Sequence, residues 1–168
     1  MIATVEKMLP PGDFTSEGGR LMKVYLDVCS YNRPYDPQNQ LSVAMEAQSK
    51  LHIQNLIRED KLELVSSYTV DYELSKNPFE MRKESIKRFI EENAAEYVSS
   101  EAEKKLEPKV KELMNNGAKE KDAYHVASAI YAGCDYFIST DYRLLKKQFD
   151  GIRMVTPVEF VTETEGEE

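Results

Sequence analysis

Strand-like and helix-like segments alternate along most of this chain, and the alternation limits the folds that it can adopt. The runs 23–28 (KVYLDV), 62–67 (LELVSS), 135–140 (DYFIST) and 151–157 (GIRMVTP) are short and rich in branched or aromatic residues, as strands are. Strands joined through helices usually lie parallel, and helices then cover both faces of the sheet. The pattern predicts an α/β fold of three layers, with a central, mostly parallel sheet of four to five strands flanked by helices.

The segments between these runs carry apolar residues at helical spacing. We expect a long helix over 37–60, a short one over 68–76 and another over 78–98. A capping box at Ser100–Glu103 predicts the start of a further helix, and an alanine-rich helix follows from Asp122. The chain of 168 residues is large enough to bury all of these elements around a single core.

The two ends of the chain differ from its middle. Residues 1–21 contain two stretches rich in proline and glycine and show no sustained periodicity, which predicts a flexible leader. Translation from Met22 stays open as an alternative start. Residues 161–168 are short and acidic, and we expect a disordered tail there. The predicted folded domain therefore spans 22–160.

Charge and composition exclude few partners. The net charge of −8 counts against a nucleic-acid partner, but residues 22–158 carry 22 acidic and 20 basic residues and are close to neutral. No apolar run approaches the roughly 18 residues that span a bilayer, so no membrane partner is expected. The N-terminus lacks a basic segment that leads into an apolar one, and we expect a cytoplasmic location.

Acidic residues stand where the predicted strands end. Asp27 lies near the end of the first strand, and Asp141 directly follows the run DYFIST. Because ligands bind outside the carboxyl ends of parallel strands, we expect these two carboxylates to meet at one edge of the sheet. Asp122, in the first turn of a helix where the dipole favours negative charge, and Glu73, on the short helix after the second strand, can reach the same edge. Two alternatives stay open: Asp122 as a plain helix cap, and Asp71 in place of Glu73.

The four acids also resemble a known pattern. Asp27 in VYLDVCSYNRP, Glu73 in SSYTVDYEL, Asp122 in KDAYHVASAIYAGCDYFIST and Asp141 in STDYRLL are similar, in order and context, to the acids of PIN domain nucleases. That family includes the VapC-type ribonuclease toxins of toxin–antitoxin pairs. The resemblance covers residues 22 to about 160, and its most specific part is the C-terminal block that ends in Thr-Asp.

The resemblance implies a metal-dependent endoribonuclease that hydrolyses RNA phosphodiester bonds. Asp27, Asp122 and Asp141 would be direct or water-mediated ligands of Mg²⁺ or Mn²⁺, and Glu73 would be a ligand or would position the attacking water. Carboxylate oxygens suit both cations, which lower the pKa of a bound water. The expected partner is an RNA substrate, and an antitoxin protein and a homodimer are left open.

Further residues near these acids are candidates for contacts with the substrate. We expect Thr140 to hydrogen-bond to a carboxylate or to a substrate phosphate, and Asn32 and Arg33 to touch the RNA backbone. For His125 the expected role is packing, although it lies one helical turn after Asp122.

Other classes of protein fit the sequence less well. A phosphatase with an aspartyl nucleophile would need a second acid two residues after Asp27, where this chain has Cys29. The main alternative is non-catalytic: a PIN-like fold that serves as an RNA-binding or protein-interaction module.

Overall fold

The computed structural model describes residues 14–16 and 19–165, and within them the strands form one all-parallel sheet. Its five strands are β1 (Lys23–Leu26), β2 (Glu63–Ser67), β3 (Ala94–Val98), β4 (Tyr136–Ile138) and β5 (Arg153–Val155), in the order β3-β2-β1-β4-β5. The helices are α2 (Val28–Asn32), α3 (Leu41–Arg58), α4 (Tyr68–Ser75), α5 (Glu80–Asn93), α6 (Glu103–Asn115), α7 (Glu120–Tyr131), α8 (Tyr142–Leu145) and α9 (Pro157–Glu165), with single 3-10 turns at η1 (Arg33–Tyr35) and η2 (Ser100–Ala102).

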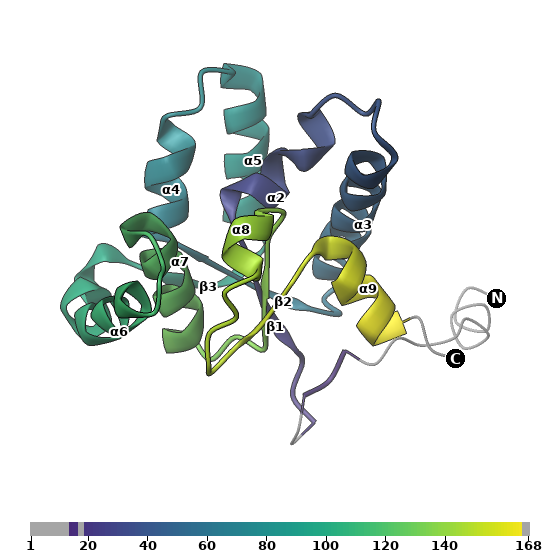
Figure 1. Ribbon diagram of the computed structural model, residues 1–168. Coiled ribbons are helices and arrows are strands. Elements are labelled where there is room, and N and C mark those ends of the chain that lie inside the picture. The colour runs from purple at the N-terminus through teal and green to yellow at the C-terminus, as the bar shows by residue number, and fades with distance from the viewer. Residues whose placement is uncertain (1–13, 17–18, 166–168) are drawn as a thin grey trace.

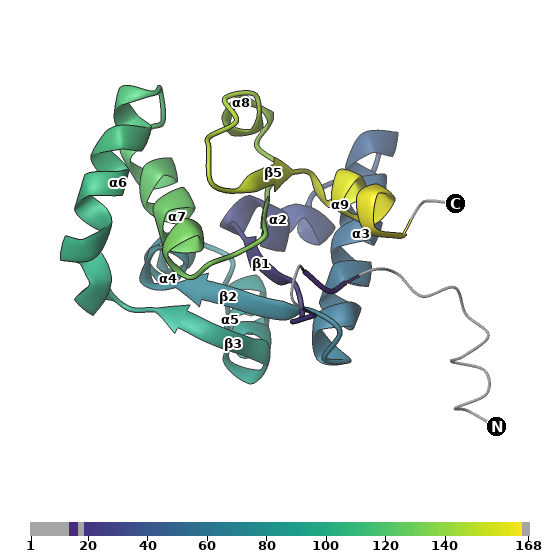
Figure 2. The ribbon, with the colours of Figure 1, turned by 90° about the horizontal axis from the view of Figure 1, so that it is seen from below.

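Helices cover both sides of this sheet. Figures 1 and 2 show α6 and α7 on one side and α3 and α9 on the other, with the sheet between them. The predicted three-layer α/β fold is therefore confirmed. None of the helices in the described part of the chain combines the length and the apolar run that crossing a bilayer requires.

The central strand is buried on both of its faces, as parallel strands usually are. Val24, Tyr25 and Leu26 of β1 are 0% exposed, and the Tyr25 ring stacks on Phe137 of β4 with 5.4 Å between ring centroids. Burying a large apolar side chain stabilises a fold by roughly 1.5 to 3 kcal/mol. The residues that follow β1 and β4 are therefore anchored by strands whose side chains are packed in the core.

The strand order places a topological switch point at the centre of the sheet. The chain builds outward from β1 through β2 to β3, and then returns to add β4 on the other side of β1. In folds of this kind the ligand crevice lies at the carboxyl ends of the two strands that flank the switch. Leu26 pairs with Ile138, so Asp27 and Ser139 follow their strands at the same level. Figure 1 shows α2, α4 and α8 at this edge.

One predicted helix is in fact a helix followed by a strand. We expected helix over 78–98, but α5 ends at Asn93 and residues 94–98 form β3, where Tyr97 pairs with Ser66 and Val98 with Ser67. The apolar residues of this stretch fit helical spacing. What makes the last five a strand is pairing with β2, which lies far away in the sequence.

Parts of the predicted leader and of the predicted tail lie within the described residues. Of the predicted leader, residues 14–16 and 19–21 are described: Thr15 forms a bridge with Leu21, and the guanidinium of Arg20 binds both carboxylate oxygens of Asp135 at 3.2 Å. Residues 1–13, 17–18 and 166–168 lie outside the described part.

The predicted tail is helical as far as Glu165, because α9 begins with a capping box that we did not identify. The Thr156 hydroxyl accepts from the Glu159 amide at 3.0 Å, and the Glu159 carboxylate accepts from the Thr156 amide at 2.8 Å. Two further residues favour this helix: Pro157 at its first position, and Phe160, whose ring is fully buried.

Candidate active site

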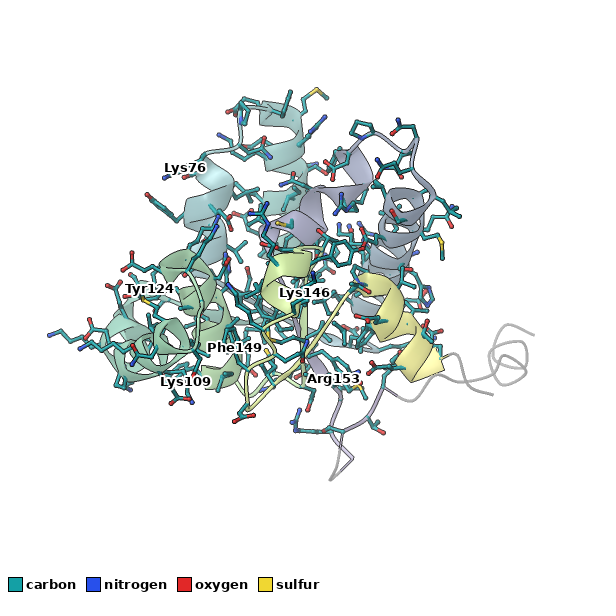
Figure 3. All side chains as sticks on the ribbon, viewed as in Figure 1. Lys76, Lys109, Tyr124, Lys146, Phe149 and Arg153 are labelled. Carbon is teal, nitrogen blue, oxygen red and sulfur yellow. The ribbon has the colours of Figure 1, made fainter. Side chains whose placement is uncertain are left out.

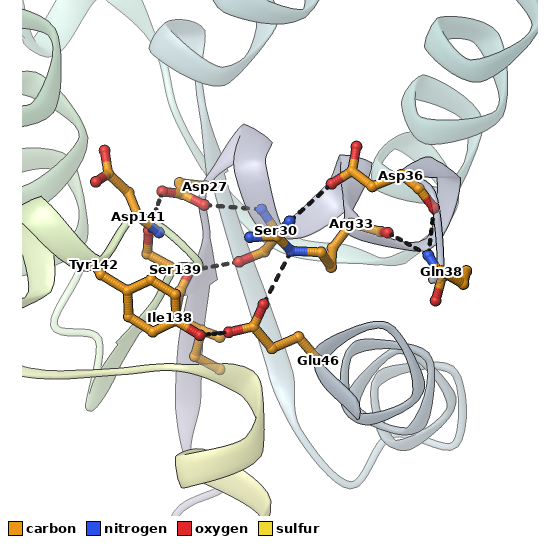
Figure 4. Close-up of polar contacts among 10 residues, drawn as sticks. All are labelled: Asp27, Ser30, Arg33, Asp36, Gln38, Glu46, Ile138, Ser139, Asp141 and Tyr142. Carbon is orange, nitrogen blue, oxygen red and sulfur yellow. Dashed lines mark hydrogen bonds and ion pairs between the residues drawn. The ribbon is translucent and has the colours of Figure 1, made fainter. Parts of the chain in front are cut away.

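Asp27 and Asp141 are joined through one serine at the switch point. The Ser139 hydroxyl donates to Asp27 Oδ2 at 2.6 Å and accepts from the Asp141 amide at 2.9 Å (Figure 4). The other carboxylate oxygen of Asp27 accepts from the Ser30 amide at 3.1 Å and so caps α2. The Ser30 hydroxyl donates to the Ile138 carbonyl at 3.1 Å and ties α2 to the end of β4. These contacts fix Asp27, which is only 5% exposed, in one orientation.

Asp141 caps the short helix α8. Its Oδ1 accepts from the amides of Arg143 and Leu144 at 3.0 and 3.3 Å. Within the described residues, no hydrogen bond occupies its second oxygen, Oδ2. One carboxylate oxygen of Asp141 is therefore held by backbone amides, and the other accepts no hydrogen bond within the described residues.

Glu73 is held by two side chains of α7. Its Oε1 lies 2.8 Å from His125 Nε2, and its Oε2 lies 2.6 Å from Lys121 Nζ. Burial raises the pKa of Glu73, but the contacts with His125 and Lys121 outweigh burial, so the pKa is lowered from its ordinary value. Glu73 is consequently an anion, and both of its oxygens are engaged.

A buried chain of hydrogen bonds runs from Glu73 into the sheet. His125, which is 2% exposed, places Nδ1 2.7 Å from the Tyr25 hydroxyl, and that hydroxyl lies 2.6 Å from Ser67 Oγ. Ser67 Oγ also accepts from the Val70 amide at 3.3 Å and caps α4. One assignment gives each proton an acceptor: Ser67 donates to Tyr25, Tyr25 to His125 Nδ1, and His125 Nε2–H to Glu73. In this assignment the His125 N–H points at the Glu73 carboxylate.

Asp122 is the fourth predicted acid. Its carboxylate forms no hydrogen bond among the described residues. It is half-buried in the first turn of α7. Its pKa is raised, first by burial and then by the negative charge of Asp141, with a smaller contribution from Glu73. We call Asp27, Glu73, Asp122 and Asp141 the acid cluster.

The charges of the acid cluster act on the same small region. Burial raises the pKa of Asp27, its hydrogen bonds with Ser139 and Ser30 oppose this, and Glu73 adds to the rise. The pKa of the Cys29 thiol is raised to about 12, first by desolvation and then by the charges of Asp27, Glu73 and Asp141. The charges of three carboxylates thus act on this one thiol and the nearby charge of Lys121 opposes them; a region of net negative charge attracts cations.

The acid cluster has the right donors for a hard divalent cation, but its side chains do not converge as they stand. Carboxylate oxygens from separate elements are the ligands that Mg²⁺ and Mn²⁺ prefer. Among residues 14–16 and 19–165, however, no three histidine, cysteine, aspartate or glutamate side chains are close enough together to share an ion. One oxygen of Glu73 is paired with Lys121 instead.

The two predicted candidates for the second acid lie in different surroundings. Asp71 accepts a short hydrogen bond from the Tyr97 hydroxyl of β3, whereas Glu73 contacts α7 beside Asp122. Glu73 therefore contacts the helix that carries Asp122, and its charge acts on Asp27 and Asp122, whereas Asp71 bonds to the edge strand.

Two of the three predicted substrate contacts, Arg33 and Asn32, are engaged within the protein. The Arg33 guanidinium forms ion pairs with Glu46 at 3.0 Å and Asp36 at 3.1 Å, and Tyr142 donates to the same Glu46 carboxylate (Figure 4). Asn32 accepts from the side-chain amide of Asn77 at 3.3 Å. The hydroxyl of buried Thr140 bonds no carboxylate among the described residues; Ser139, one position earlier, does so instead.

Sequence reasoning missed two residues of this site, Ser139 and Lys121. It also missed the hydrogen-bonding role of His125. Ser139 and Lys121 each lie within two positions of a predicted acid, which is the one signal that marks them. The role of His125 depends on Tyr25, which is 100 residues away along the chain.

A comparison with protein-family models finds no match for this chain. A comparison with curated proteins finds no significant match either.

Proposed function

We propose that this protein is a PIN-like, Mg²⁺- or Mn²⁺-dependent endoribonuclease that hydrolyses RNA phosphodiester bonds at the acid cluster. The observation that carries the proposal is that Asp27 and Asp141 follow neighbouring strands at the carboxyl edge of a parallel sheet, beside its switch point, and that the charges of Asp141 and Glu73 raise the pKa of Asp122. Burying like charges together destabilises a fold. Binding of a cation would offset this repulsion between the carboxylates, so a metal site accounts for the arrangement.

The residues of the site have distinct parts in this proposal. Ser139 and the amides at the starts of α2 and α8 orient Asp27 and Asp141, so these two carboxylates are set before a ligand arrives. Asp122 contributes the carboxylate that has no hydrogen bond within the described residues, and His125 orients Glu73. A bound divalent cation would supply an acidified water and neutralise charge on the departing oxygen.

RNA is the proposed substrate, and the resemblance to VapC-type toxins makes a toxin of a toxin–antitoxin pair the corresponding biological role. An antitoxin protein and a second copy of this chain are its candidate partners, in the cytoplasm. This part of the proposal rests on the four-acid pattern and on the near-neutral charge of residues 22–158.

The alternative is a PIN-like module that binds RNA or protein without cleaving it. The ion pair of Glu73 with Lys121, and the absence of three converging ligands among the described residues, favour this alternative. The two functions differ in one respect that is easy to measure, which is whether RNA is cut when a divalent cation is present.

Incubation of the purified protein with total RNA, in Mn²⁺ or in chelator, tests the proposal. We expect cleavage in Mn²⁺ alone, with ends that map to discrete sites, and loss of cleavage in Asp27→Asn and Asp141→Asn. Cleavage that survives chelation, or that both variants retain, would contradict it. RNA binding without cleavage under either condition would establish the non-catalytic alternative.

A further inference from the structure

Lys121 stands between the acid cluster and a cavity lined with tyrosines. Its ammonium lies 2.6 Å from Glu73 Oε2, while its side chain remains 55% exposed. The cavity has a volume of about 400 Å³, and it is lined by Lys121, by Thr69, by the three tyrosines Tyr68, Tyr72 and Tyr124, and by the carboxylates of Glu103 and Glu120. Lys121 therefore contacts Glu73 on one side and this cavity on the other.

Three tyrosines and Lys121 give this cavity stacking surfaces and a cation for single-stranded nucleic acid, while Glu103 and Glu120 place two carboxylates in the same lining. Aromatic side chains stack on unpaired bases of any sequence, and basic groups next to them bind the backbone. Lys76 lies over the Tyr72 ring, with its ammonium 4.4 Å from the ring centroid. Figure 3 shows Lys76 at the end of α4 and Tyr124 on α7, on the same side of the molecule. A strand of RNA that crosses Lys121 from the acid cluster would find tyrosines beside it.

The two groups that hold Glu73 differ in how firmly they are placed. His125 is buried and is fixed by its hydrogen bond with Tyr25, so it stays on the carboxylate. Lys121 is half exposed, on a flexible stem, and exposed ion pairs contribute little to stability. Lys121 is therefore the partner that Glu73 can exchange for another cation.

We propose that Lys121 binds a phosphate of the RNA, and that in the free protein it occupies the Glu73 carboxylate in place of the divalent cation. This inference rests on the proposed function and adds to it a substrate-binding residue. When a phosphate draws the ammonium away, Glu73 Oε2 becomes free to join the other three acids. Binding of RNA and binding of the cation then favour each other, and the site is complete only when both are present.

The first test is the affinity for Mn²⁺ of the full chain without RNA, measured by calorimetry for Lys121→Met and for Lys119→Met. Lys119 is exposed near the start of the same helix, and its ammonium forms no ion pair with another described residue. Lys119→Met therefore controls for the loss of one positive charge. We expect Lys121→Met to bind Mn²⁺ on the order of threefold more tightly than Lys119→Met, since only Lys121 competes for Glu73. Equal affinities would overturn the proposal.

The second test is binding of a fluorescein-labelled oligouridylate in chelator, where no cleavage is expected. Loss of one phosphate contact on a single strand lowers the slope of log affinity against log salt by about 0.7. We expect this decrease, with weaker binding at low salt, in Lys121→Met and not in Lys119→Met. An unchanged slope in Lys121→Met would contradict a phosphate contact.

An additional variant separates failure of this inference from failure of the proposed function. Asp122→Asn removes a member of the acid cluster and leaves Lys121 in place. If the parent binds Mn²⁺ and Asp122→Asn does not, while the two lysine variants behave alike, the acid cluster binds metal and only the role of Lys121 is wrong. If neither the parent nor any variant binds Mn²⁺, the proposed function and this inference both fail.

Discussion

Replacement of Tyr25 by phenylalanine removes the central link of the buried chain behind Glu73. The Tyr25 hydroxyl contacts Ser67 Oγ at 2.6 Å and His125 Nδ1 at 2.7 Å, and the exposure of the three side chains is 0%, 0% and 2%. Phenylalanine keeps the ring, and with it the stacking on Phe137. The change therefore isolates the two hydrogen bonds.

The expected loss follows from burial. A hydrogen bond contributes about 0.5 to 1.5 kcal/mol net, and a buried polar group left without a partner costs about 1 to 3 kcal/mol. Tyr25→Phe leaves His125 Nδ1 and the Ser67 hydroxyl without the hydroxyl that bonds to both of them. We therefore expect the free energy of unfolding to fall by about 3 kcal/mol, which corresponds to a decrease in Tm of roughly 6 to 12 °C for a domain of this size.

Urea unfolding in chelator at pH 7, followed by circular dichroism, measures this loss. Tyr136→Phe is the matched control, because the Tyr136 hydroxyl donates to Glu163 at 3.2 Å on the surface, and we expect its loss to stay below about 0.5 kcal/mol. Equal m-values in the three proteins would show that the unfolded states are comparable. If Tyr25→Phe is no less stable than Tyr136→Phe, the buried chain does not exist as described.

Two further predictions concern charge. Asp122→Asn should be more stable than the parent in chelator at pH 7, because burial and the charge of Asp141 raise the folded-state pKa of Asp122. That penalty is absent below the unfolded pKa of about 3.9 and grows as the pH rises through the folded pKa, so the gap between the two proteins should nearly vanish at pH 4; an equal gap at both pH values would refute the reasoning. Arg33→Ala should lower the free energy of unfolding by about 3 kcal/mol, because Glu46 is only 3% exposed and loses the guanidinium that lies 3.0 Å away. A loss below about 1 kcal/mol in urea unfolding would mean that the hydrogen bond from Tyr142 is enough to hold Glu46.

Much of the sheet could be predicted from the sequence, because its inner strands are apolar on both faces. The runs that contain β1, β2 and β4 stand out as short segments bounded by polar residues. The edge strand β3 could not be recognised, since three of its five residues are exposed and it lacks an apolar face. Its conformation depends on pairing with β2, and such pairing is not encoded in local periodicity.

For the site, the sequence marked the acids but not the groups that hold them. Asp27 and Asp141 were expected at one edge because a parallel sheet aligns the ends of its strands, and the structure brings both to Ser139. The contacts of Glu73 with Lys121 and His125 depend on how α4 packs against α7. Residue spacing within either helix carries no information about that packing.

The rate of Mn²⁺-dependent RNA cleavage by Asp122→Asn, measured beside that of Asp71→Asn, tests the central claim most directly. Both variants lose one carboxylate, but Asp122 belongs to the acid cluster whereas Asp71 bonds to Tyr97 outside it. We predict that Asp122→Asn loses at least roughly a hundredfold in rate, as expected when transition-state stabilisation of about 2.7 kcal/mol is removed, and that Asp71→Asn stays within a factor of two or so of the parent. Equal rates for the two variants, or a loss confined to Asp71→Asn, would contradict the assignment of the acid cluster as the catalytic site.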